Sequence, residues 1–303
     1  MRRTAILAVI IILTLTGSYL GKRLVSDPRL ATTGSETQAY SRIVSLAPSI
    51  TEMLFKLGLG DRIVGVTRFC KYPPEALSIK KVGGFYDPNY EAIIASKPDL
   101  VILSVEQHKT KRFLTSVGLN VLEVDHSTIL GILDSLAEIG QACGIQQKAL
   151  DAVIALNQRM DLVKNKTNGL PRPRVMISIA RSMSSESLTD IYIAGDDAFY
   201  DEMIFLAGGV NAYRGKMKYP SVSSEGILKL DPDVIVDLVP ETAEQDWKDE
   251  AILKDWQRFP DVEAVKEKRV HVFRQGFMVI PGPRFILTVE ELARVIHPEV
   301  KWN

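Results

Sequence analysis

Two glutamates occupy equivalent places in two stretches of this sequence that share the same internal spacing. Glu91 in YEAIIASKPDLVI and Glu225 in SEGILKLDPDVIV each open a short predicted helix, and a Pro-Asp pair follows seven residues after each. Proline ends such a helix because it lacks an N–H group and disfavours the helical conformation of the preceding residue. The apolar run that follows is typical of a strand buried on both faces. The two units predict two similar lobes, each presenting a carboxylate that can form an ion pair with a partner.

Each glutamate also has a simpler explanation. An acidic side chain in the first turn of a helix stabilises that helix by about 0.3–1 kcal/mol through its dipole, whether or not a partner is present. Either Glu91 or Glu225 alone could be explained in this way. The matched spacing of the pair favours a docking function for both.

Histidine side chains are common metal ligands, so their spacing indicates whether the chain forms a metal site. The chain has four of them, His108, His126, His271 and His297, and no two show HxH or HxxxH spacing. His108 and His126 fall in loops after predicted strands of the first half, where they could face a cleft. A zinc or manganese site would need about three histidines and a carboxylate brought together. We therefore predict no metal site formed by the protein alone.

Cysteines and catalytic motifs give no sign of an enzyme. Cys70 and Cys143 form no CxxC pair, and Cys143 lies in an apolar helical pattern that predicts a buried thiol. A disulfide between the two is the alternative. The chain contains no GxSxG motif, no phosphate-binding loop and no GxGxxG motif. We predict that the protein is not an enzyme.

Composition fits a protein of two lobes with no attraction to nucleic acid. The chain has 303 residues, of which 46% are hydrophobic, and it carries 37 basic and 37 acidic side chains. This length allows two sizeable cores. Because the charges balance and no basic run occurs, no electrostatic footprint of a nucleic-acid partner is present.

The N-terminal segment predicts export from the cytoplasm. Residues 1–23 combine a basic start with an apolar run at 5–15, which is shorter than the about 20 residues of a full membrane span. We predict a signal peptide or an uncleaved N-terminal anchor. Residues 24–40 are rich in Ser, Thr and Gly and predict a flexible tether. The expected location is periplasmic or otherwise extracytoplasmic.

Strand and helix patterns alternate along the remaining chain. Residues 42–46 predict a strand, and the helix expected at 50–57 follows it, with Ser49 and Glu52 at the spacing of a capping box. A long amphipathic helix is expected at 145–168.

These patterns predict an α/β fold of two similar α/β lobes, 41–144 and 169–303, joined by a single long rigid helix at 145–168. The ligand cleft is expected between the lobes, at the carboxyl ends of their strands. Because a single connecting helix is stiffer than extended crossovers, we expect the cleft to close little when ligand binds.

Residues 41–297 resemble the helical-backbone class of periplasmic substrate-binding proteins, which serve ABC importers of cobalamin, ferric siderophores and haem. Six fragments in the same order carry the resemblance: RIVSLAPSITE at 42–52, YPPEA at 72–76, KPDLVI at 97–102, LAGGVN at 206–211, YPSVSSE at 219–225 and PGPR at 281–284. The resemblance implies a monomer without a cofactor, a small metal chelate as ligand, and an ABC importer transmembrane permease dimer as partner. It also implies that Glu91 and Glu225 pair with arginines of that permease.

The resemblance places the aromatic ligand contacts of the cobalamin-binding members on Phe69, Phe85 and Tyr219, with Tyr86 adjacent. Flat apolar rings suit a large macrocycle or the hydrophobic face of a chelate. An anionic ferric siderophore would instead need several convergent cations. Four cations lie near the predicted pocket loops: Arg68, Lys71, Arg181 and Arg274.

We therefore predict that the protein delivers a corrinoid to an ABC importer. The predicted ligand-binding set is Phe69, Phe85, Tyr86, Tyr219, Arg181 and Arg68. A ferric siderophore or haem is the alternative ligand, and a co-receptor or sensor without transport is the alternative function. His126 as an axial ligand to the metal of a corrinoid or haem also stays open.

Overall fold

The computed structural model describes residues 40–181, 191–196, 198–240 and 248–302. The predicted signal segment, and the tether up to residue 39, lie outside these ranges. Residues 39–303 form one compact unit. Among the described helices, none combines the length and the apolar character that crossing a bilayer requires.

The first lobe is built on a four-stranded parallel sheet in the order β2-β1-β3-β4. Its strands are β1 (Ile43–Ser45), β2 (Ile63–Val66), β3 (Leu100–Ser104) and β4 (Val121–Val124). Its helices are α2 (Pro48–Lys56), α3 (Tyr90–Ala95), α4 (His108–Ser116) and α5 (Ile129–Ala142), with 3₁₀ turns at Gly60–Arg62, Pro74–Ser78 and Val105–Gln107. Every residue of β1 and β3 is buried, as expected where helices cover both faces of a parallel sheet.

The second lobe contains a six-stranded mixed sheet. Its main path is β10-β9-β5-β6-β8, and β7 pairs with β5. The strands are β5 (Arg174–Ala180), β6 (Ile191–Ile193), β7 (Val210–Asn211), β8 (Ser221–Val222), β9 (Val234–Leu238) and β10 (Val270–Phe273). The helices are α7 (Ala198–Leu206), α8 (Ser224–Leu230), α9 (Asp249–Trp256), α10 (Glu263–Lys266) and α11 (Phe285–Ile296), with a 3₁₀ turn at Gly276–Val279. The predicted α/β class is confirmed, although β6 runs antiparallel to β5 and β8.

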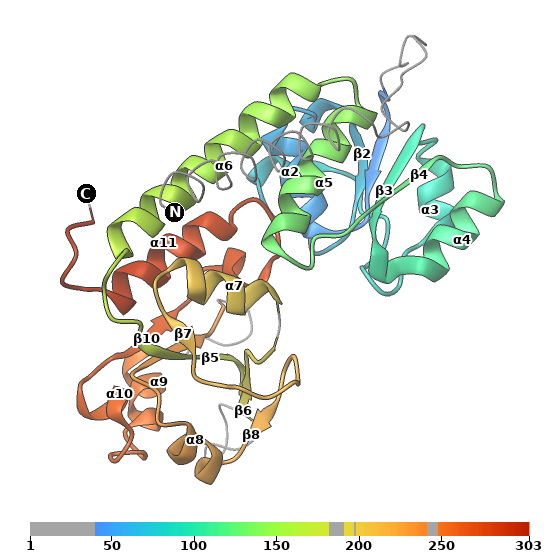
Figure 1. Ribbon diagram of the computed structural model, residues 1–303. Helices are drawn as coiled ribbons and strands as arrows, with labels where there is room; N and C mark the ends of the chain where they lie inside the picture. Colours follow the sequence, from blue (N-terminus) through green and yellow to red (C-terminus); the bar gives the residue numbers. More distant parts are fainter. Residues whose placement is uncertain (1–39, 182–190, 197, 241–247, 303) are drawn as a thin grey trace, which may run out of the picture. The chain divides into compact units, whose positions relative to one another are not determined.

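The helix between the lobes is α6, which runs from Gln146 to Thr167 and packs on a helix of each lobe (Figure 1). On the first lobe, a Cβ atom added to Gly140 would lie 2.2 Å from that of Ala149, so only glycine allows α5 and α6 to approach this closely. On the second lobe, the Arg159 guanidinium donates two hydrogen bonds of 2.8 and 2.7 Å to the Glu290 carboxylate of α11. These contacts hold α6 against both lobes.

The Pro-Asp pairs found in the sequence have a structural role in both lobes. Asp99 accepts hydrogen bonds from the backbone N–H groups of Ser41 and Arg42, at 2.8 and 2.9 Å. In the second lobe, Asp233 accepts one of 2.6 Å from the N–H of Arg174. The residue before each proline lies in the left-handed region, with φ of 47° at Lys97 and 38° at Asp231. Each Asp therefore fixes the start of the neighbouring strand, a function that the helix-stop interpretation did not include.

Both cysteines are buried free thiols. Cys70 lies near the hydroxyl groups of Thr51 and Thr67, with its sulfur 3.1 Å from each. Burial raises the pKa of Cys143 above its ordinary value. The interpretation of Cys143 as a small buried apolar residue is confirmed, and the alternative of a disulfide with Cys70 is not realised.

Candidate functional site

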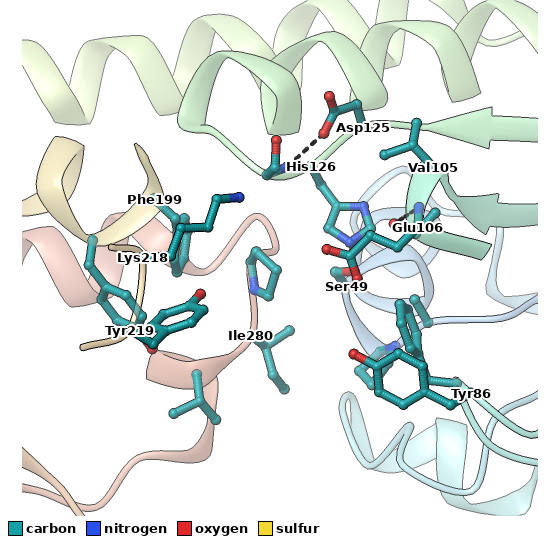
Figure 2. A pocket seen from close by; sticks show the side chains of 18 residues that line it. Ser49, Tyr86, Val105, Glu106, Asp125, His126, Phe199, Lys218, Tyr219 and Ile280 are labelled. Carbon is teal, nitrogen blue, oxygen red and sulfur yellow. Dashed lines mark hydrogen bonds between the residues drawn. The ribbon is translucent and has the colours of Figure 1, made fainter. Parts of the chain in front are cut away.

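A cavity of about 370 Å³ is lined by residues of both lobes (Figure 2). The first lobe contributes the segments that follow three parallel strands: Ala47 to Ser49 after β1, Ser104 to Glu106 at the end of β3, and Asp125 to Ser127 after β4. Strand carboxyl ends of this kind are where ligands bind in open α/β sheets. The volume lies near the lower end of the about 300–1,000 Å³ that small-molecule sites occupy, so a large macrocycle would project from the opening.

Three of the predicted aromatic contacts line this cavity. Phe85 and Tyr86 come from the first lobe, where their rings pack edge to face with centroids 4.8 Å apart. Tyr219 comes from the second lobe and faces them across the cavity (Figure 2). Phe69, the fourth predicted aromatic, is exposed and is not among the lining residues.

None of the four predicted cations lines the cavity. The Arg181 side chain is 1% exposed and forms ion pairs of 2.8 Å with Asp237 and 2.9 Å with Asp255. This position corrects the prediction that Arg181 contacts the ligand: the two aspartates, on β9 and α9, satisfy its charge inside the second lobe. Arg68 pairs with Asp87 at 2.9 Å and lies over the ring of Phe69. It too lies outside the cavity lining, as do Lys71 and Arg274.

Several lining residues were not found from the sequence. The first lobe adds Glu106 and Asp125, and the second adds Phe199, Tyr200, Lys218 and the segment 279–281. Glu106 and Asp125 follow the strands β3 and β4, so the rule that ligands bind at strand carboxyl ends would have indicated them. Lys218 has no comparable signal, since it lies in the irregular segment between β7 and β8.

His126 is a buried titratable group of the cavity wall, at 7% exposure. Its Nε2 atom lies 3.2 Å from the Ser49 hydroxyl, and its Nδ1 atom is buried and has no hydrogen-bond partner within the described ranges. Burial lowers the pKa of His126 to about 4, against the opposing effect of the Asp125 charge. The imidazole is therefore neutral at pH 7, and its Nδ1 atom is a buried polar atom without a hydrogen-bond partner among the described residues.

The buried imidazole predicts a loss of stability in acid. Because the pKa of His126 is about 4 in the folded protein and its ordinary value in an unfolded chain is 6.5, the unfolded chain takes up a proton first as pH falls. The free energy of unfolding should decrease between pH 6.5 and 4 by about 3 kcal/mol from this group. Urea denaturation of the wild type and of His126→Gln at pH 7 and pH 4 isolates this contribution. Equal acid losses in the two proteins would contradict it.

A buried ion pair joins the two lobes near the cavity. Glu52 of α2 is 3% exposed, and its carboxylate accepts hydrogen bonds of 2.6 and 2.9 Å from the guanidinium of Arg284, beside α11. The guanidinium also lies 3.7 Å from the ring centroid of Tyr72. Burial raises the pKa of Glu52, and the hydrogen bond and charge of Arg284 oppose that rise. The capping-box prediction was wrong: α2 has no side-chain cap, and Glu52 bonds across the lobes instead.

The two docking candidates have the same local geometry. Glu91 is the second residue of α3, and Asn89 caps this helix by accepting a hydrogen bond of 2.9 Å from the N–H of Ala92. Glu225 is the second residue of α8, which Ser223 caps through the N–H of Gly226 at 3.2 Å. Both carboxylates are exposed.

An apolar side chain accompanies each of these glutamates three residues later. Ile94 and Leu228 are both 45% exposed. Residues three apart lie on the same face of a helix, so each lobe presents an acid beside an aliphatic group.

The sequence matches the periplasmic binding protein family over residues 43–275. The chain belongs to the periplasmic binding protein family. An uncharacterized ABC transporter substrate-binding lipoprotein of Bacillus subtilis is 33% identical over 85% of this chain and 80% of its own length. The structure of the periplasmic vitamin B12 binding protein BtuF of Vibrio cholerae superposes with a TM-score of 0.72 at 25% identity, covering 85% of this chain and 97% of that one. The periplasmic heme-binding protein RhuT of Roseiflexus shares the fold, with a TM-score of 0.72 at 24% identity over 85% and 98% of the two chains.

Membership of the periplasmic binding protein family confirms the resemblance, the two-lobed fold and the general class of the protein. It is a substrate-binding protein of the ABC importer class, with an extracytoplasmic location. The family and its structural neighbours are binding proteins rather than enzymes. One of these neighbours is a vitamin B12-binding protein and the other is a haem-binding protein.

Proposed function

We propose that this periplasmic binding protein holds a corrinoid of the cobalamin type in the cavity between its lobes and delivers it to an ABC importer permease. The vitamin B12-binding relative of Vibrio cholerae supports this ligand class. Aromatic rings from both lobes line the cavity, with Phe85 and Tyr86 on one side and Phe199 and Tyr219 on the other. Such rings offer wide contact area to a flat macrocycle at little cost in rotamer entropy.

The charge of the cavity wall favours a corrinoid over a polyanionic chelate. Among the described lining residues, Glu106 and Asp125 are acidic and Lys218 alone is a lysine or arginine. A ferric catecholate or another polyanionic chelate would bury several negative charges beside two carboxylates, with one ammonium to compensate them. Burying anionic groups without paired cations is prohibitive. A corrinoid, whose edge carries neutral amides, avoids that cost.

Docking to the permease forms the second part of the proposal. Glu91 and Glu225 are exposed, capped in the same manner and placed at the same position of α3 and α8. Arginines of a permease dimer could pair with one carboxylate on each lobe. A co-receptor or sensor without transport would need no such pair.

Haem is the alternative ligand, and His126 is the observation that favours it. A neutral imidazole with an unpaired nitrogen lines the cavity, and imidazole is a common axial ligand of haem iron. The carboxylates of haem would face Glu106 and Asp125 and be repelled by them, unless those carboxylates paired with Lys218 or pointed into solvent. Because of this repulsion, we favour a corrinoid over haem as the ligand.

The test is a calorimetric titration of cyanocobalamin at two salt concentrations. Phe85→Ala and Tyr219→Ala should each lower affinity by about 30-fold, the effect of losing about 2 kcal/mol at a central aromatic contact. Phe69→Ala and Arg68→Ala serve as matched controls outside the cavity lining and should change affinity less than threefold. Affinity should depend weakly on salt, because a ligand with little net charge offers little to screen. No binding of cyanocobalamin, with tight and salt-sensitive binding of haem or a ferric catecholate, would overturn the proposal.

A further inference from the structure

Two carboxylates reach the cavity from neighbouring strands of the first lobe. Glu106 follows β3 and Asp125 follows β4, and these strands pair in parallel with Ser104 opposite Val124. Both side chains are exposed and line the cavity (Figure 2). Neither carboxylate forms a salt bridge with any described residue. They are therefore available to a ligand.

The charge and hydrogen bonding of the first-lobe side chains determine which ligand groups they can bind. Hydrogen bonds from Ser127 lower the pKa of Asp125, so this carboxylate is ionised over the whole neutral range. An ionised carboxylate accepts hydrogen bonds and cannot donate them. Between the two acids lies His126, buried to more than nine-tenths, with its Nδ1 atom unpaired. The first-lobe wall thus carries negative charge and presents the acceptor oxygens of Glu106 and Asp125 to the cavity.

The second-lobe wall of the cavity carries a positive charge. Lys218 of the second lobe extends into the cavity from the side that faces Asp125 and His126 (Figure 2). Its charge acts on Asp125, yet the two do not form an ion pair within the salt-bridge distance. One ammonium can pair with one anionic group of a ligand. A ligand held between the walls would place hydrogen-bond donors toward the first lobe and at most one anion toward the second.

We propose that Glu106 and Asp125 select ligands whose edge carries primary amide groups and reject those that carry carboxylates there, while Lys218 binds a single phosphodiester. This assignment rests on the proposed function and names the edge chemistry of its ligand. Amide N–H groups donate to the carboxylates, whereas a carboxylate in the same place meets a like charge. Hydrogen bonds to an ionised acceptor are about twice as strong as neutral ones, so the selection is large.

The first experiment compares cyanocobalamin with monocarboxylate derivatives in which one peripheral amide is hydrolysed. Because only the amides at the first-lobe wall matter, the set of derivatives is screened for the one that the wild type binds least. The wild type should prefer cyanocobalamin over that derivative by about 30-fold or more. The isosteric variant Glu106→Gln/Asp125→Asn should reduce the preference to less than about threefold. The side-chain amides of this variant are uncharged, so they can accept a hydrogen bond from an amide of cyanocobalamin and donate one to the carboxylate of the derivative. Asp61→Asn/Glu75→Gln removes the same two negative charges at exposed positions of the first lobe that do not line the cavity, and this charge-matched control should keep the wild-type preference.

The second experiment tests Lys218 with cyanocobalamin and with cobinamide, which lacks the phosphodiester. Lys218→Met should weaken cyanocobalamin about tenfold and leave cobinamide unchanged. Equal effects on both ligands would overturn the phosphodiester assignment.

The outcomes separate this inference from the proposed function. If the wild type binds no corrinoid, the proposed function fails and the inference fails with it. If the wild type binds cyanocobalamin but treats all its carboxylate derivatives alike, or if the double variant keeps the full preference, the proposed function stands and the assignment of Glu106 and Asp125 is overturned. Circular dichroism spectra matching the wild type show that each variant is folded.

Discussion

Reversing the charge at both docking positions, in Glu91→Lys/Glu225→Lys, should abolish uptake of the ligand through the importer while leaving the ligand affinity of the isolated protein within about twofold. Both carboxylates are exposed at the same position of two equivalent helices, and neither lines the cavity. Loss of one partner of a hydrogen-bonded charge pair buried at an interface costs roughly 2–5 kcal/mol, and reversal adds repulsion. Uptake of labelled ligand by cells, with calorimetry on the purified variant, measures both quantities.

A control variant separates docking from simple helix stabilisation. Glu75→Lys/Glu250→Lys makes the same two charge reversals, one in each lobe, at exposed first-turn positions of other helical segments. It loses a comparable dipole interaction, about 0.3–1 kcal/mol for each site at most, and should retain uptake. If the Glu91/Glu225 variant imports ligand like this control, the docking function is refuted.

Replacing Glu52 by alanine should lower the free energy of unfolding by about 3–5 kcal/mol. The change removes one partner of a buried pair and leaves the Arg284 guanidinium, which is bonded bidentately to Glu52, without its counter-charge. The pair also lies near the cavity, because Ser49 and Pro281, three residues before each partner, line it. Urea denaturation of the purified variant at pH 7 measures the cost.

A double replacement tests whether the unpaired charge is the cause. In Glu52→Leu/Arg284→Met both charges are removed and apolar side chains fill much of the space, so most of the stability should return. A cost below about 1 kcal/mol for Glu52→Ala, or no recovery in the double variant, would show that the ion pair does not join the lobes as inferred.

The main elements of the fold could be predicted because local patterns specify them. The paired units around Glu91 and Glu225 do form a helix followed by a buried strand in each lobe. The connecting helix expected at 145–168 extends from Gln146 to Thr167. Periodicity and helix stops act over a few residues, so they remain visible in the sequence. The antiparallel pairing of β6 was not predicted, because a strand of three residues carries no sign of its direction.

The site was predicted less completely because its charges depend on distant partners. Arg181 was expected to contact the ligand, yet its counter-ions are 56 and 74 residues away in the chain. Glu52 has the spacing of a capping box, but its partner Arg284 is 232 residues away. Phe85 and Tyr219 were also predicted from the sequence, and both line the cavity. They lie outside helices and strands, in segments that can reach a cleft. Spacing within a helix turn therefore does not establish which partner a buried charged side chain has.

The position at which the predicted tether joins the first lobe affects how tightly the protein needs to bind the permease. Asp99 holds Ser41 and Arg42 beside the end of α3, and Glu91 lies at the other end of this six-residue helix, about 9 Å away at 1.5 Å per residue. The predicted tether, 24–40, can span at most about 60 Å at about 3.5 Å per residue. If the N-terminal segment remains in the membrane, the tether confines the protein to a layer of about 60 Å beside the membrane that holds the permease. Under that condition docking can be weaker than for a released protein, which would have to bind from dilute solution.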